Sequence, residues 1–263
     1  MSARRFLAGL AFSLLMVATT PAHAGRACEP HHLTPQAITL GLALGQHSEQ
    51  ALDNSGADVA VIARVGQDLS TYGLRYSHLG LAYRDAASGA WRIVHKLNQC
   101  GTDHASLYRQ GLADFFMDAP VDYEAAVMPL SPVAVEALQP LLADNRRIAT
   151  LDERHYSMLA YPWAQRYQQS NQWALETLAW AVEPRAATRV QAQAWLRLQG
   201  YQPATLQLST LTRLGARLTA ANIAFDDHPD ARRFAGKIDT VTVESVFDFL
   251  HRSGLGGPLA VVR

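Results

Sequence analysis

His78 is the residue of this sequence best placed to do chemistry. It stands at the start of a short apolar run, residues 76–83, whose alternation predicts a strand with His78, Gly80 and Ala82 on one face. Residues 85–90 have the composition of a hairpin turn, and residues 91–97 form a second strand-like run, so we expect the two runs to pair antiparallel. A histidine at a strand end beside a glycine can face a cleft, and histidine exchanges protons near neutral pH.

The sequence contains two cysteines, Cys28 and Cys100. In an oxidising compartment such a pair predicts a disulfide. Closing a loop of about 70 residues would stabilise the fold by ~4 kcal/mol in the chain-entropy description. The alternative is a reactive thiol at Cys100 with His104 as its base, and non-reducing mass spectrometry distinguishes the two.

The first 24 residues are predicted to be a secretory signal peptide. Arg4 and Arg5 precede an apolar run, residues 6–18, and Ala22-His23-Ala24 has the small-x-small pattern of a signal-peptidase site. We therefore expect a mature chain that begins at Gly25 and is periplasmic or secreted. No later apolar run is long enough for an integral membrane span.

The charge balance gives no reason to expect a nucleic-acid partner. The full sequence has 23 Lys and Arg against 23 Asp and Glu, and loss of the two arginines of the signal peptide leaves 21 against 23, a formal net charge of −2. A protein with this balance lacks the positive electrostatic field that would attract nucleic acids or anionic membranes.

Sequence signatures of metal or cofactor sites are also lacking. Residues 226–230, Asp-Asp-His-Pro-Asp, have metal-ligand types, but their consecutive spacing is typical of a loop. We find no Gly-x-Ser-x-Gly elbow, no phosphate-binding glycine loop and no zinc signature. We therefore expect no metal and no cofactor.

The predicted elements place an α-helix first, strands next and helices last. Besides the hairpin we expect strands over residues 59–65 and 123–130, a helical turn through Leu107 and Tyr108, and helices over about 34–55, 131–143, 170–182, 188–199, 208–222 and 240–252. This order predicts an α+β fold, with an antiparallel sheet packed against helices. We expect residues 25–263 to form one domain, with a core over about 34–183 and a helical extension over about 184–263.

Two resemblances extend this interpretation. Residues 61–66, the Ser77-His78-Leu79-Gly80-Leu81 motif, the hairpin and a later polar turn that enters a helix resemble the circularly permuted branch of the papain-like NlpC/P60 superfamily. More narrowly, the chain from about Gln46 to Phe249 resembles DUF2145, a family of uncharacterised exported bacterial proteins, with residues 63–68 and 167–173 carrying the match.

The papain-like resemblance implies roles for particular residues. His78 takes the place of the catalytic base, and Ser170 stands where the family has its nucleophilic cysteine at a helix N-terminus, where backbone N–H groups favour developing negative charge. A serine gains less from that position than a cysteine does and needs a strong, well-aligned base. His95 or Asn98, on the second strand of the hairpin, would orient the imidazole.

Other residues near the helix start complete the implied cleft. Gln169 and Asn171 could supply oxyanion contacts, and Tyr161 would line the cleft. Trp173 fits either a core position or a ligand-stacking position. Ser170 also fits a simple helix cap.

Two functions follow from these roles. The serine favours a non-catalytic papain-like protein whose cleft binds a ligand or protein of the cell envelope. The alternative is an acyl hydrolase or transferase of amidase or esterase type, with Ser170 as nucleophile and His78 as base.

Overall fold

The computed structural model describes residues 32–118 and 120–263. The predicted signal peptide and Cys28 lie outside these residues. Among the described residues no helix combines the length and apolarity that a bilayer crossing requires.

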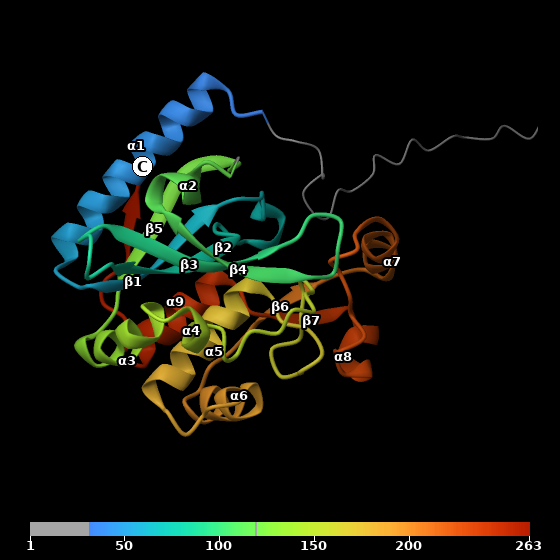
Figure 1. The fold of residues 1–263 in the computed structure, drawn as a ribbon. Coiled ribbons are helices and arrows are strands. Elements are labelled where there is room, and N and C mark those ends of the chain that lie inside the picture. The colour runs from blue at the N-terminus through green and yellow to red at the C-terminus, as the bar shows by residue number, and fades with distance from the viewer. Residues whose placement is uncertain (1–31, 119) are drawn as a thin grey trace, which may run out of the picture.

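A six-stranded antiparallel sheet forms the centre of the molecule (Figure 1). Its strand order is β4-β3-β2-β1-β5-β8. The strands are β1 (Val59–Val65), β2 (His78–Arg84), β3 (Trp91–Asn98), β4 (Ala105–Gly111), β5 (Asp122–Pro129) and β8 (Ala260–Val262). β1 is buried along its whole length because it lies between β2 and β5 and helices cover both faces.

Helices cover the two faces of the sheet unequally (Figure 1). On one face lie α1 (Pro35–Ser55) and α2 (Leu112–Phe116), which pack on a small core around Ile62, Ile93 and Phe115. On the other face lie α3 (Pro132–Leu142), α4 (Asn145–Ile148), α5 (Ser170–Val182) and α9 (Val243–Arg252) over the larger core. Side chains alternate between these two cores along each strand.

The C-terminal third adds strands as well as helices. It contains α6 (Arg189–Leu198), α7 (Thr210–Thr219) and α8 (Asp230–Phe234), together with a separate hairpin of β6 (Ala204–Gln207) and β7 (Lys237–Thr240). β8 pairs with β5, and α9 contributes to the larger core. The final helix and strand are therefore part of the main packing unit.

The predicted fold class is confirmed: helices pack on an antiparallel sheet. The hairpin of β2 and β3 forms as expected, and Phe115 and Phe116 are fully buried. The helical turn expected at Leu107 and Tyr108 is wrong, because these residues belong to β4 and pair with β3. Local propensity did not reveal a partner strand that tertiary structure supplies.

Candidate functional site

His78 begins β2 and is held by a short relay of side chains. Its Nε2 lies 2.8 Å from Nδ1 of His95, and Nε2 of His95 lies 2.7 Å from Oε1 of Gln110 on β4. An amide oxygen only accepts hydrogen bonds, so His95 donates to Gln110, and its Nδ1 accepts from His78. His95, one of the two residues expected to orient His78, therefore fixes both the direction and the tautomer of the half-buried His78 ring.

The relay lies against aromatic side chains on the α1/α2 face of the sheet. The ring of Phe115 is 5.9 Å from that of His78 and 5.2 Å from that of His95, and the Arg64 guanidinium lies 4.7 Å from the Phe115 ring centre. Burial, and then the positive charge of Arg64, lower the pKa of His95 to about 3. His95 is therefore neutral at physiological pH. Because its charged form is strongly disfavoured, it does not readily take up a second proton.

Side-chain hydrogen bonds join the N-terminus of α5 to two segments that are distant in the sequence, and we call these contacts the α5 staple. Gln169 accepts the N–H of Asn171 through its side chain, which caps the helix, and donates to Thr240 and to the carbonyl of Val241. Asn171 accepts the N–H of Leu79 at 3.1 Å and donates to Val241. The two amides that were expected to supply oxyanion contacts are thus committed to the protein's own backbone.

Ser170 is almost completely buried. It is 6 % exposed, and its proximity lowers the pKa of Tyr156 against the larger effect of burial. Burial raises the pKa of Tyr156. Because a phenol that stays protonated cannot act as a base, Tyr156 does not replace the missing imidazole beside this serine.

His78 and Ser170 are not brought together, which corrects the expected catalytic pair. The His78 ring contacts His95 and Phe115 on the α1/α2 face, whereas α5 packs against β2 and β3 from the opposite face. Leu79, the next residue of β2, carries the side chain that meets the α5 core. The period of two along a strand therefore places the neighbour of His78, and not His78 itself, toward the helix.

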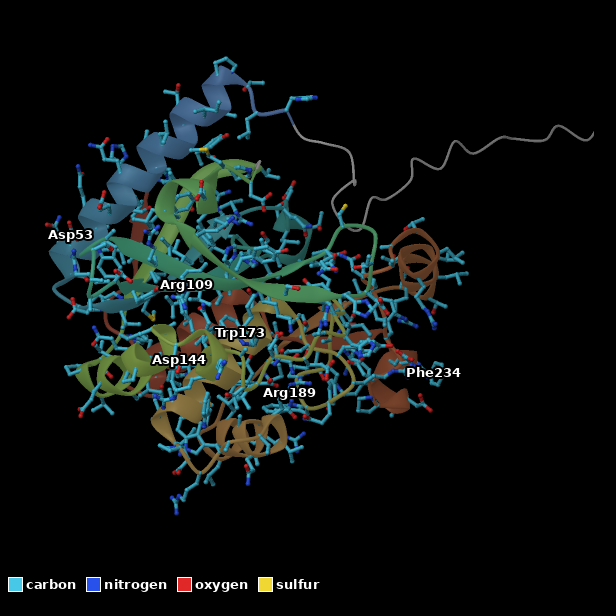
Figure 2. All side chains as sticks on the ribbon, viewed as in Figure 1. Asp53, Arg109, Asp144, Trp173, Arg189 and Phe234 are labelled. Atoms are coloured by element: carbon cyan, nitrogen blue, oxygen red, sulfur yellow. The ribbon has the colours of Figure 1, made fainter. Side chains whose placement is uncertain are left out.

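The remaining residues that were expected in the site take part in hydrogen bonds and packing within the protein. Asn98 donates to the carbonyls of Thr102 and His104 and closes the turn after β3, so it does not take part in the His78 relay. Tyr161 packs against His228 at 5.1 Å between ring centres. Trp173 is 0 % exposed in the larger core, and Figure 2 shows it between the sheet and the helices below.

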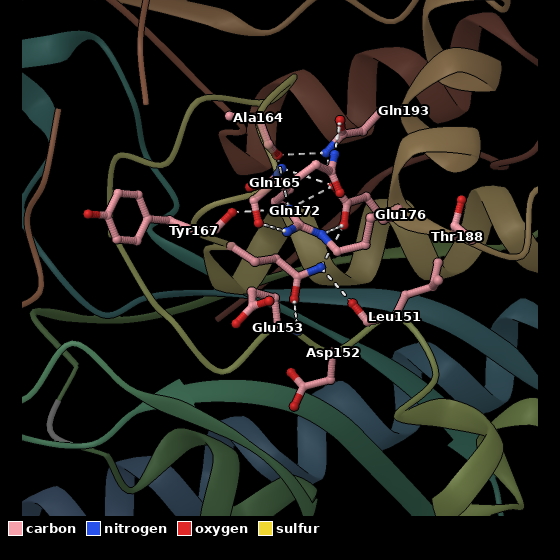
Figure 3. Close-up of polar contacts among 12 residues, drawn as sticks. Leu151, Asp152, Glu153, Ala164, Gln165, Tyr167, Gln172, Glu176, Thr188 and Gln193 are labelled. Carbon is pink, nitrogen blue, oxygen red and sulfur yellow. Dashed lines mark hydrogen bonds and ion pairs between the residues drawn. The ribbon is translucent and has the colours of Figure 1, made fainter. Parts of the chain in front are cut away.

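A buried charged network on the α5 face was not predicted from the sequence (Figure 3). Lys96 is 0 % exposed, lies 2.9 Å from Asp152, and donates to Gln168. Gln168 in turn donates to Glu176, which also pairs with Arg189 at 2.8 Å. The network fastens the long segment between α4 and α5 to the sheet. Its sequence signal is weak, because Lys96 shares its strand face with the polar residues Arg92 and Asn98 and so does not stand out there.

The acidic loop 226–230 is also explained by packing. Asp227 and His228 form a fully buried pair at 2.9 Å, and His228 also donates to the carbonyl of Asp239. Asp227 accepts the N–H of Tyr161. These contacts attach the loop to the segment before α5.

The predicted Cys28–Cys100 bridge involves a residue outside the described part of the chain, so it stays a prediction. Within the described residues no cysteine is free.

Residues 51–250 match the family described as "Uncharacterized protein conserved in bacteria (DUF2145)". The chain belongs to the DUF2145 family. The match covers most of the 263 residues, including the His78 relay and the α5 staple. Neither a curated protein nor a solved structure matches the chain significantly.

Proposed function

We propose that this DUF2145 protein is an exported, non-catalytic binding protein of the cell envelope, with a fold of the papain-like type. One observation carries the proposal: Gln169 and Asn171, on either side of Ser170, are engaged inside the protein, and the imidazole expected to activate Ser170 lies on the other face of the sheet. A serine without an aligned base is a weak nucleophile. The acyl hydrolase built on Ser170 and His78 is therefore the less supported alternative.

The proposed binding surface is the region around His78, at the end of the sheet where β2 begins. A half-buried imidazole whose ring is fixed by a buried partner gives a ligand a preorganised surface to pack against. Burying a neutral histidine and a glutamine behind it carries a desolvation cost that packing alone does not require. The ligand that we propose is the peptide portion of the cell wall, in keeping with the papain-like resemblance of the Ser77–Leu81 motif.

An acyl probe distinguishes binding from hydrolysis. We expect a fluorophosphonate to leave Ser170 unlabelled in the folded protein, as judged by intact mass. Labelling of Ser170 that disappears in His78→Ala would instead support the acyl hydrolase.

Co-sedimentation with purified peptidoglycan tests the binding site. Replacing a central contact residue of a binding surface costs on the order of 2 kcal/mol, so His78→Gln should weaken binding at least about tenfold. His251→Gln, at the exposed end of α9, is the matched control and should bind like the wild type. Absence of wild-type binding, or equal binding by His78→Gln, would contradict the proposal.

A further inference from the structure

Two histidines outside the proposed binding surface face each other across an isolated antiparallel β-bridge. His104 pairs with His155, and the flanking hydrogen bonds run from Ala105 to Arg154 and from Tyr156 to Asp103. The two histidines therefore form the non-hydrogen-bonded type of pair, in which opposite side chains come closest. Their ring centres are 5.2 Å apart, and both side chains are partly exposed, at 43 % and 59 %.

Each imidazole has a carboxylate beside the same ring nitrogen. Nδ1 of His104 lies 2.7 Å from Asp103, and Nδ1 of His155 lies 3.3 Å from Glu153. A carboxylate beside Nδ1 favours the proton on that nitrogen, which places the lone pair on Nε2. Histidines that bind metals in proteins are commonly oriented in this way, by a carboxylate on the nitrogen opposite the metal.

The backbone that carries the pair is fixed on both sides. The His104 carbonyl accepts hydrogen bonds from the backbone of Gln99 and from the side chain of Asn98. The His155 carbonyl accepts the N–H of Gln168, the same residue that contacts buried Lys96. The backbone that carries the two rings is therefore in place before any ligand arrives, which lowers the ordering cost of binding.

The geometry points to a surface site for a divalent transition-metal ion, with Zn²⁺ as its representative, bound by Nε2 of His104 and Nε2 of His155. Imidazole is a ligand that suits Zn²⁺, and water can fill the remaining tetrahedral positions. The described residues hold no group of three or more His, Cys, Asp or Glu side chains arranged around a metal, so the site supplies two protein ligands and orients them through Asp103 and Glu153.

Another histidine pair among the described residues, His78 and His95, shows why the carboxylates matter. Nitrogens of His78 and His95 face each other at 2.8 Å and are joined in one hydrogen bond, so that contact has no room for a metal ion. At His104 and His155 a carboxylate lies beside Nδ1 of each ring, so the hydrogen-bonded nitrogen is not the one proposed to bind the metal. A metal there would join the turn after β3 to the segment that precedes α5.

Zinc titration of the full protein, purified without a polyhistidine tag, tests the site. We expect one Zn²⁺ per chain by calorimetry, and a rise in the thermal unfolding midpoint with zinc concentration. His104→Gln and His155→Gln should each weaken zinc binding at least about tenfold, and Asp103→Asn and Glu153→Gln should each weaken it by about tenfold or more. The double histidine variant should lose the zinc-dependent rise.

His251→Gln is the control for adventitious binding to exposed histidines and should bind zinc as the wild type does. Circular dichroism of every variant without metal checks that the fold is retained. The site is refuted if the wild type binds no zinc at millimolar concentration. It is also refuted if either single histidine substitution leaves the affinity unchanged, because both nitrogens are required.

Discussion

Glu124 on β5 offers a quantitative test of the electrostatics, because a buried carboxylate there holds together three segments. It is 3 % exposed and accepts hydrogen bonds from Arg75 at 3.0 Å, Tyr76 at 3.0 Å and Arg263 at 2.8 Å. The hydrogen bond from Arg75 is the largest of the causes that lower the pKa of Glu124 from 4.5 to about 2. Burial opposes this shift, and the hydrogen bonds from Arg263 and Tyr76 add to it.

This lowered pKa translates into a pH-dependent stability. A carboxylate whose pKa is lower in the folded state stabilises the fold above its unfolded pKa of 4.5, and this contribution is lost as the pH falls toward 2. The shift corresponds to at most ~3 kcal/mol at pH 7, of which about 2 kcal/mol is lost by pH 3.

Glu124→Gln keeps the shape of the side chain and removes the charge. We expect it to lower the free energy of unfolding by about 2–3 kcal/mol at pH 7, because the guanidinium groups lose their anionic partner. The difference from the wild type should shrink by about 2 kcal/mol between pH 7 and pH 3, because protonation makes the wild-type side chain neutral as well.

Urea denaturation at pH 7, 5, 4 and 3 measures this difference. Glu136→Gln, on the exposed side of α3, is the matched control and should change stability by less than about 0.5 kcal/mol. A Glu124→Gln effect that stays constant across this pH range, or one no larger than the control, would refute the reasoning.

Three further experiments test the α5 staple, the packing at Gly80 and the predicted disulfide. Asn171→Ala should destabilise the fold by about 1–3 kcal/mol in urea denaturation, because it leaves a buried N–H of β2 unpaired; an effect near zero would mean that the staple is dispensable. Gly80→Ala should cost about 1–3 kcal/mol, because its Cβ would lie 2.5 Å from a β3 side chain. Gly111→Ala, with open space around its Cβ, is the control, and equal losses would contradict the close approach. Cys28→Ser and Cys100→Ser should each cost up to ~4 kcal/mol and the double variant little more; additive losses would count against the bridge.

Local sequence pattern predicted the parts of the fold that local physics controls. The β2–β3 hairpin follows from two alternating runs around a turn, and α3 lies within the helix expected over residues 131–143. β4 was missed because its apolar pattern is weak and its stability comes from pairing with β3. The hairpin also placed His95 among the residues near His78.

The candidate site shows where such reasoning fails. Ser170 was correctly placed at the start of a helix, but the resemblance that paired it with His78 assumed which side of the sheet that helix would cover. The two buried charges Lys96 and Glu176 were also missed as partners, because they lie far apart in the sequence and meet only through Gln168.

The sequence by itself determined that His78 lies at the head of a strand and that the strand has two distinct faces, because the alternation of side chains is a property of the extended backbone. Only the tertiary structure decided that α2 covers the face of His78 and α5 the face of Leu79. The reason is that a helix docks through apolar packing of its whole face, and the residues that decide this docking come from every part of the chain.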